Sequence, residues 1–473
     1  MESRIYCQRS LLLLLALILI LTGCASMTGI QTHATVIDAN QMTLGQDTRN
    51  QPHMAWPNEA WWRAYGDPQL DALMQTALAG SPTLKAAQAR LSQAQAFSEG
   101  RHAEMQPSLG ADVSLSQQRF SALQFIPPPW AGNYDWYNSA TVSLAYDLDL
   151  WKRQENLWKG SVEAALATAA ETQQVKLVLE TAVVRHYLRL SLDFTLLDIA
   201  RHHEAVVAER ISIARRALAA GIGTEMEVNQ AEMPSPLVRA QIQETETRIA
   251  LERNQLAALS GEGPGAGDKI SRPKLALVSS IGLPEQLPAS LVGRRPDVVA
   301  QRWHVESARE FIESAKAEFY PNINLLGFVG FQALGFGQFL SNGASVSGIG
   351  PALSLPLFDG GRRRSNLSFR SAAYDMAVEN YNAVLLGALQ DVSDQLLILQ
   401  SQTKQLSEAN QALQFAQKYY VLSQERYEHG LTDYSHVLDA RDSLLRQQAT
   451  VATVETGRLD AHAALMRALG GGV

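Results

Sequence analysis

The chain has few of the residues that covalent cross-linking or nucleic-acid binding requires. Among 473 residues there are two cysteines, Cys7 and Cys24, and aromatic residues make up 7%. Basic residues are outnumbered by acidic ones, 40 against 47, so the formal net charge is -7. An acidic chain is a poor general binder of nucleic acid, whose phosphates attract basic surfaces. Nucleic acid is therefore not expected among the partners.

Long apolar runs are also scarce. Residues 11–21 form such a run after Arg4 and Arg9, but it is too short for an ordinary spanning helix, which needs about 20 residues. It ends in Leu21-Thr22-Gly23-Cys24, which resembles a bacterial lipobox. This pattern predicts a signal peptide at 1–23, cleaved before Cys24, and acylation of that cysteine. The alternative is a plain signal peptide with a cysteine there by chance.

A mature chain of this kind would have no free thiol, which excludes disulfides and cysteine-based catalysis or metal binding. No other run of 18 apolar residues occurs in the sequence. If the mature protein spans a membrane, we therefore expect it to do so with strands.

The second half of the chain repeats the first. A shift of 214 residues brings Pro82 onto Pro296, and a shift of 209 brings Gly221 onto Gly430. The change of register falls between residues 107 and 144, where we expect a loop that tolerates length changes. The sequence thus predicts two repeats, 67–261 and 288–473, each with a helix, two strands, a long helix and a shorter helix. An N-terminal arm at 24–66 precedes them, and a linker at 262–287 joins them.

Strands are predicted where the hydrophobic period is 2, near 107–118, 140–150, 321–331 and 347–358. In the first, Leu109, Val113 and Leu115 alternate with polar or small residues. In the second half, Leu353, Leu355 and Leu357 are expected on one face. The connection at 119–138, with three prolines and several aromatics, is expected to be a hairpin loop. One apolar and one polar face are typical of half-buried strands.

Very long helices are predicted after each strand pair, because from 153 to about 220 and from about 365 to 428 only Gly160 and Gly387 interrupt the helical pattern. About 64 residues at ~1.5 Å each give roughly 95 Å, the length of a coiled coil or a helical tube. Another helix is expected from 68 to about 104. Shorter helices should run to 260 and 469, with a kink in the first at Pro234.

Four strands cannot close a barrel, and an open edge in lipid would leave backbone groups unpaired. Three chains would supply twelve strands, a number found in outer-membrane barrels with a water-filled interior. The predicted fold is an α+β membrane protein with a β-barrel of four strands per chain and very long α-helices. The alternative is a soluble sandwich with one wet face.

Several motifs together resemble one family along essentially the whole mature chain. Besides the lipobox they are Trp61-Trp62, Asp67-Pro68-Gln69-Leu70, Arg295-Pro296-Asp297-Val298, Ala315-Lys316-Ala317-Glu318-Phe319-Tyr320-Pro321, Pro356-Leu357-Phe358-Asp359-Gly360-Gly361-Arg362 and Leu469-Gly470-Gly471-Gly472. The chain resembles the TolC-type outer membrane factors, in particular their lipidated OprM/NodT branch.

This resemblance implies a homotrimer in the lipid of the outer membrane, whose β-barrel is continuous with a long α-helical periplasmic tunnel. It also implies docking to a periplasmic adaptor protein and, through it, to an inner-membrane transporter of the RND, MFS or ABC type. The trimer would be the exit channel for drugs or other small molecules, with no catalysis and no cofactor. The alternatives are a non-conducting structural lipoprotein that bridges the envelope, and an envelope enzyme, for which the sequence offers no catalytic constellation.

The resemblance places a periplasmic gate at residues 426–440. Asp439 matches a gate aspartate and Tyr427 a gate tyrosine, whereas His436 and Thr432 replace an aspartate and an arginine of a known member; Asp433 lies in the same stretch. Three copies of Asp439 around a three-fold axis would repel one another and favour cations. Three copies of His436 could make the gate pH-sensitive. The alternative is an ordinary solvated helix face.

Two turns at helix ends are expected to form the tip that meets the adaptor. They contain Gly221, Gly223 and Thr224 in the first repeat, and Gly430 and Leu431 in the second. The simpler interpretation is helix capping by glycine. We expect no metal site at His202-His203-Glu204, because adjacent positions on a helix point in different directions.

Overall fold

A computed structural model describes residues 26–42, 56–123, 125–275 and 293–472. Cys24 and part of the expected linker lie outside these residues. The chain divides into two compact units, Met1–Val36 with Leu91–Thr168 and Gln301–Tyr381, and Ile37–Arg90 with Ala169–Ala300 and Asn382–Val473. Each unit takes segments from both halves of the sequence.

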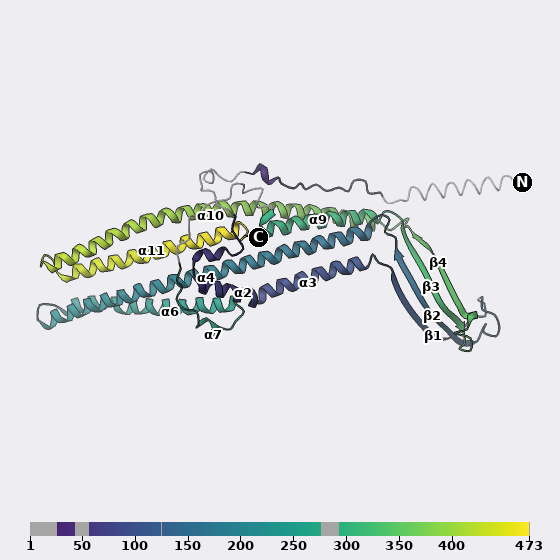
Figure 1. The fold of residues 1–473 in the computed structure, drawn as a ribbon, viewed down its shortest axis with the longest axis horizontal. Helices are drawn as coiled ribbons and strands as arrows, with labels where there is room; N and C mark the ends of the chain where they lie inside the picture. Colours follow the sequence, from purple (N-terminus) through teal and green to yellow (C-terminus); the bar gives the residue numbers. More distant parts are fainter. Residues whose placement is uncertain (1–25, 43–55, 124, 276–292, 473) are drawn as a thin grey trace. The chain divides into compact units, whose positions relative to one another are not determined.

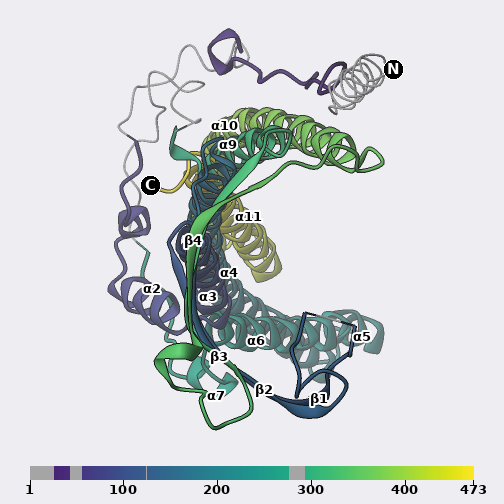
Figure 2. The same cartoon turned by 90° about the vertical axis from the view of Figure 1, so that its right-hand side faces the viewer.

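The first unit contains a four-stranded antiparallel sheet in the order β1-β2-β3-β4 (Figure 1). Its strands are β1 (Ser108–Arg119), β2 (Tyr134–Asp147), β3 (Asn322–Leu334) and β4 (Ser345–Ser354). One hairpin comes from each half of the sequence, and β2 pairs with β3 to join them. In Figure 2 the four strands follow one another along an arc. Within the described residues, the outer edges of β1 and β4 have no partner strand.

The two faces of the sheet differ in polarity. The register joins Leu109 to Leu144, Val142 to Val329, and Ile323 to Leu353 across the strands. These residues share one face, which we call the apolar face, with Val113, Leu115, Phe331 and Ile349. The opposite, polar face carries Ser108, Asp112, Ser114, Ser139, Thr141, Ser143, Asn324 and Gln332. The predicted alternation is thus confirmed along β1 and β2.

Two strand boundaries differ most from the sequence prediction. β2 begins at Tyr134, so three aromatics expected in the loop belong to the strand, as the strand preference of aromatic residues favours. β4 ends at Ser354, which pairs with Asn322 at the start of β3. Leu355 and Leu357 were wrongly placed in this strand, because β3 offers no further partner and Pro356 has no N–H to donate.

The long helices are confirmed: α4 (Arg153–Ala219) and α10 (Arg362–Glu428) have 67 residues each. The helix expected from 68 to 104 is instead two helices, α2 (Pro68–Gly80) and α3 (Pro82–Ala103). Pro82 lacks the N–H that a continuous helix would require. The other helices are α5 (Glu225–Glu232), α6 (Pro234–Leu259), α7 (Pro264–Gly267), α9 (Pro296–Ala317) and α11 (Tyr434–Ala468).

At Pro234, where a kink is expected, α5 ends and α6 begins, and Met233 between them keeps helical backbone angles. Short 3-10 helices are η1 (Ala39–Gln41), η3 (Trp61–Tyr65) and η4 (Asn342–Ala344). In the part of the chain that the structure describes, no helix has the length and apolar character needed to cross a membrane.

The core of the second unit forms where η3, α2, α4, α6, α10 and α11 meet. Buried Tyr65 donates a hydrogen bond to the Leu459 carbonyl at 3.0 Å, and its hydroxyl lies 2.9 Å from His462 Nδ1. Burial lowers the pKa of His462 to about 4, so its imidazole is neutral at pH 7. Tyr187 donates to Asp67 Oδ2 at 2.6 Å and so ties α4 to the residue that caps α2.

Candidate functional site

The long helix α10 ends in the second tip, which we define as residues 430–433. Gly430 has a φ of 71°, a conformation that side chains other than glycine rarely adopt. Its N–H donates to the Tyr427 carbonyl at 2.9 Å, and the Leu431 N–H donates to the Arg426 carbonyl at 2.8 Å. These two bonds form the Schellman arrangement that ends a helix at glycine.

Asp433 caps the start of α11. Its Oδ1 accepts from the Ser435 N–H at 3.1 Å and from the His436 N–H at 3.4 Å. His436 Nδ1 lies 2.9 Å from the same oxygen. Hydrogen bonds from Ser435 and His436 lower the pKa of Asp433 to about 2. Two predicted gate residues, Asp433 and His436, therefore contact each other in the cap, and Thr432 lies in the turn just before them with a partly exposed side chain.

The first tip, residues 221–224, repeats this construction. Gly221 has a φ of 73°, and the Ile222 N–H donates to the Ala217 carbonyl at 3.1 Å. A Cβ at Gly223 would lie 2.9 Å from the Leu218 nitrogen, so this position also favours glycine. Both tips thus end a long helix with the same backbone bonds.

Thr224 begins the next helix of the first tip with a capping box. Its hydroxyl accepts from the Glu227 N–H at 3.3 Å, while Glu227 Oε2 accepts from the Thr224 N–H at 2.7 Å. At the 209-residue shift these residues correspond to Asp433 and His436.

Asp439 forms an ion pair that the sequence analysis did not predict. Its Oδ1 lies 2.8 Å from Arg210 Nη2, and the same nitrogen lies 2.7 Å from Asp442 Oδ2. The side chain of Asp439 is 57% exposed, whereas that of Asp442 is 16% exposed. One arginine of α4 therefore holds two carboxylates of α11.

An apolar seam between α4 and α11 positions this ion pair. Val206 packs against Leu438 and Leu445, and Ile199, Ile213 and Tyr434 complete the cluster. Residues 199, 206 and 213 are spaced by seven, as are 438 and 445, which is the spacing of a coiled coil. His203 and Arg210 have the same spacing beside the seam, and this regularity is the signal that could have identified Arg210.

A cavity of about 510 Å³ lies beside Arg210 within the second unit. Its lining is mostly apolar and includes Val207, Ala214, Ile222 and Leu438. Glu227 and Asp442 add charge to it. The side chains of α4, α5 and α11 therefore leave an open space beside the ion pair.

Tyr427 reaches across the second tip rather than toward Asp439. Its ring centroid lies 4.8 Å from that of Tyr434, edge to face. Four of the five residues predicted for the gate therefore lie in separate contacts, which are the cap, this ring pair and the ion pair of Arg210. The fifth, Thr432, lies in the turn before the cap. Among the described side chains, no group of three or more His, Cys, Asp or Glu residues could hold a metal ion.

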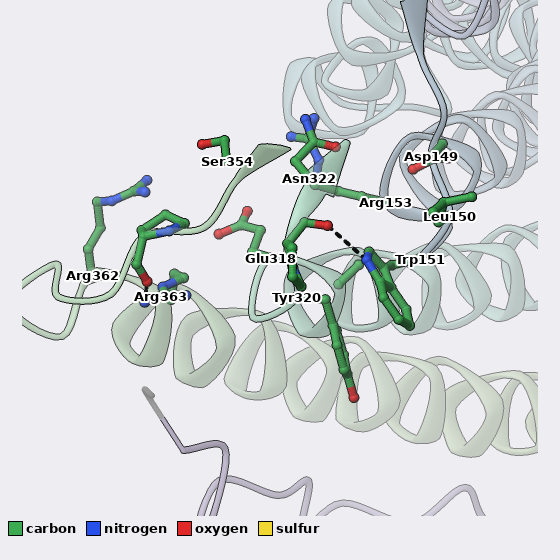
Figure 3. A pocket seen from close by; sticks show the side chains of 13 residues that line it. Asp149, Leu150, Trp151, Arg153, Glu318, Tyr320, Asn322, Ser354, Arg362 and Arg363 are labelled. Carbon is green, nitrogen blue, oxygen red and sulfur yellow. Dashed lines mark hydrogen bonds between the residues drawn. The ribbon is translucent and has the colours of Figure 1, made fainter. Parts of the chain in front are cut away.

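In the first unit, the strands connect to the long helices around a cavity of about 250 Å³ (Figure 3). Asp149 caps α4, accepting from the Gln154 N–H at 3.0 Å and the Glu155 N–H at 2.8 Å. Trp151 Nε1 donates to the Pro321 carbonyl at 2.8 Å, and its ring lies against that of Tyr320.

The junction of the second half uses the same kind of cap. Asp359 Oδ2 accepts from the Arg363 N–H at 3.2 Å and from Arg363 Nε at 2.6 Å. Gly360 and Gly361 supply the left-handed backbone that Asp149 and Lys152 supply in the first half. In each half, an aspartate side chain therefore caps the long helix that follows the strands.

Comparison with known proteins agrees with this architecture. The family model described as outer membrane efflux protein matches residues 73–262 and 287–471. The fusaric acid resistance protein FusA of Burkholderia cepacia is 40% identical, over 98% of this chain and 88% of that protein. The multidrug resistance outer membrane protein MdtP of Escherichia coli K12 is 31% identical, over 96% and 94%.

The fold is also that of a solved structure. The outer membrane protein VceC of Vibrio cholerae superposes with a TM-score of 0.81 at 31% identity, covering 88% of this chain and all of that one. Because the family model matches most of the chain and these relatives align along nearly all of it, the chain belongs to the outer membrane efflux protein family.

Proposed function

We propose that this protein is the outer-membrane exit channel of a tripartite efflux system. Proteins of this family and fold are channels. The observation that carries the proposal is the sheet, which has an apolar face, a polar face and two edges without partners in the described chain. Open edges are unfavourable in lipid, so the sheet needs neighbours that continue it.

Three copies would satisfy those edges. The β1 edge of one chain would pair with the β4 edge of the next, giving a closed barrel of twelve strands with the apolar face toward lipid. The polar face would then line a water-filled pore, and the long helices would extend it into the periplasm. Acylation of Cys24 would add a lipid anchor at the membrane.

The cargo would be small organic molecules. The relatives are named for resistance to fusaric acid and to multiple drugs, and this supports a similar cargo here. A periplasmic adaptor and an inner-membrane RND, MFS or ABC transporter would deliver the cargo. The two tips, with their backbone-defined turns at Gly221 and Gly430, would be the surfaces that meet the adaptor.

The ion pair of Arg210 would hold the closed state. It joins α4 to α11 through Asp439 and Asp442, next to the cavity between these helices and α5. In the trimer, three copies of Asp439 would lie near the pore axis, and their repulsion would be balanced by Arg210. Opening would require this pair to separate.

Planar bilayers test the proposal directly. The purified, acylated protein is reconstituted, and single-channel current is compared with that of Asp439→Ala. We expect small, cation-selective, rarely open currents that become larger or more frequent in the variant. A silent bilayer from protein that light scattering shows to be monomeric would favour the structural lipoprotein instead. Mass spectrometry of wild type and Cys24→Ser tests the lipid anchor.

A further inference from the structure

The polar face of the sheet also carries apolar side chains, among them Leu334 at the end of β3 and Val346 on β4. Between Asn324 and Gln332 this face carries Leu326 and Phe328 instead of polar side chains. Both are about half exposed, at 46% and 48%. A single exposed apolar residue is ordinary, but two successive ones in the middle of a strand on this mainly polar face form a small apolar patch.

The neighbouring strands leave room for this patch. Phe328 is registered with Ser143 on β2 and with Gly348 on β4, which are small residues. A Cβ on Gly348 would lie only 2.7 Å from Phe328 Cε1 and 2.9 Å from its Cζ. The phenyl ring therefore lies over the backbone of β4, in space that only glycine leaves open.

This position is far along the chain from both tips. Phe328 is the seventh of the thirteen residues of β3, so it lies at the middle of the strand. In the first unit Phe331, three residues later, has the opposite orientation and belongs to the apolar face. The side chains of Phe328 and Phe331 therefore lie on opposite faces of β3.

We propose that Phe328, supported by Leu326, forms an apolar contact site for cargo inside the pore. The inference rests on the proposed function, because three chains would bring three phenyl rings to one level of the barrel. A ring of apolar side chains narrows a water-filled pore and disfavours hydrated inorganic ions. The ligands that it favours are small organic molecules with an aromatic surface, including organic cations, which the face of a phenyl ring attracts.

Single-channel recording with a matched pair of variants tests this inference. Phe328→Ser is compared with Phe331→Ser, and the aromatic cation tetraphenylphosphonium is added as a blocker of the potassium current. We expect Phe328→Ser to raise the potassium conductance about 1.5-fold or more and to weaken block about 2- to 5-fold, the range of an exposed cation–π contact. Phe331→Ser should leave the conductance and the block unchanged.

A third variant separates the effect of the aromatic ring from the effect of a large apolar side chain. Phe328→Leu keeps an apolar side chain, so it should assemble even where serine does not, and it should weaken the block while changing the conductance little. Wild-type values of both conductance and block in Phe328→Leu and Phe328→Ser would overturn the inference. Equal effects of Phe328→Ser and Phe331→Ser would also overturn it. A wild type that never conducts would instead contradict the proposed function itself.

Discussion

The two halves of the chain build their tips in the same way and then diverge. Both long helices have 67 residues and end at a left-handed glycine, Gly221 or Gly430. Both following helices begin with a side-chain cap. Beyond the cap, the first half breaks between α5 and α6, whereas α11 runs for 35 residues.

The side-chain partners diverge as well. At the 209-residue shift, Asp439 and Asp442 correspond to Gln230 and Met233, and Arg210 corresponds to Tyr419. The ion pair of Arg210 therefore joins α4 to α11. The residues at the corresponding positions, Tyr419, Gln230 and Met233, cannot form such a pair. Duplication has preserved the backbone turns, which depend on local conformation, while the lateral faces of the helices have become specialised.

The largest expected difference between the two halves concerns the glycine inside each long helix, Gly160 in α4 and Gly387 in α10. A Cβ at Gly160 would lie 2.9 Å from Phe311 Cε1, whereas nothing lies within 4 Å of a Cβ at Gly387. We expect Gly160→Ala to destabilise the fold by about 1–3 kcal/mol through overpacking. Gly387→Ala should stabilise it by about 0.5–1 kcal/mol, because alanine favours helix.

Thermal unfolding of the two glycine variants measures both effects. The double variant Gly160→Ala/Phe311→Leu should recover part of the loss, because the smaller side chain relieves the contact. A Gly160→Ala protein as stable as wild type would show that the ring of Phe311 moves aside freely.

The ion pair on α11 should have the next largest effect. Arg210→Gln leaves Asp439 and Asp442 without their shared cation, and breaking a partly buried pair should cost about 1–2 kcal/mol. We expect an open probability about tenfold higher, since ~1.4 kcal/mol corresponds to a factor of ten. Single-channel recording measures it.

Arg215→Gln is the matched control for this experiment. Arg215 pairs with Glu232 in the first half, where the arginine side chain is 65% exposed, against 27% for Arg210, and the glutamate is 39% exposed. Surface pairs contribute about 0–1 kcal/mol, so this variant should gate almost like wild type. Equal effects of the two substitutions would argue against a special role for α11.

The glycine caps should behave alike in the two halves. Gly221→Ala and Gly430→Ala each place a Cβ on a left-handed residue, at a cost of about 1 kcal/mol. Neither site has atoms within 4 Å of that Cβ, so the cost is conformational. Hydrogen exchange should show similar losses of protection at both tips, and a loss confined to one tip would contradict the equivalence.

Lowering the pH should produce the smallest difference between the two tips. Hydrogen bonds hold the pKa of Asp433 at about 2, below its value of about 3.9 in an unfolded chain. The stabilisation is therefore complete above about pH 4 and is lost as the pH falls toward 2. Asp433→Thr installs the kind of cap that Thr224 provides in the first half. Hydrogen exchange at the second tip should then lose this acid dependence; if the dependence persists, another group is responsible.

Several features could be predicted because they are local. The alternation of Leu109, Val113 and Leu115 with polar residues follows from the period of a strand, and it correctly identified the apolar face. The long helices follow from uninterrupted helical residues that end at Gly221 and Gly430. The break before Pro82 was equally local, since proline lacks an N–H, and the prediction of one continuous helix there was wrong.

The sequence by itself determined the duplication, the strand faces and the helix ends, because each depends on backbone periodicity or on one residue's conformational preference. Only the tertiary structure decided which side chains meet across elements. Arg210 and Asp439 are 229 residues apart, and their contact depends on the rotation of α4 against α11 about the seam at Val206 and Leu438. Likewise, the space for the Phe328 ring exists because the strand register sets it opposite Gly348.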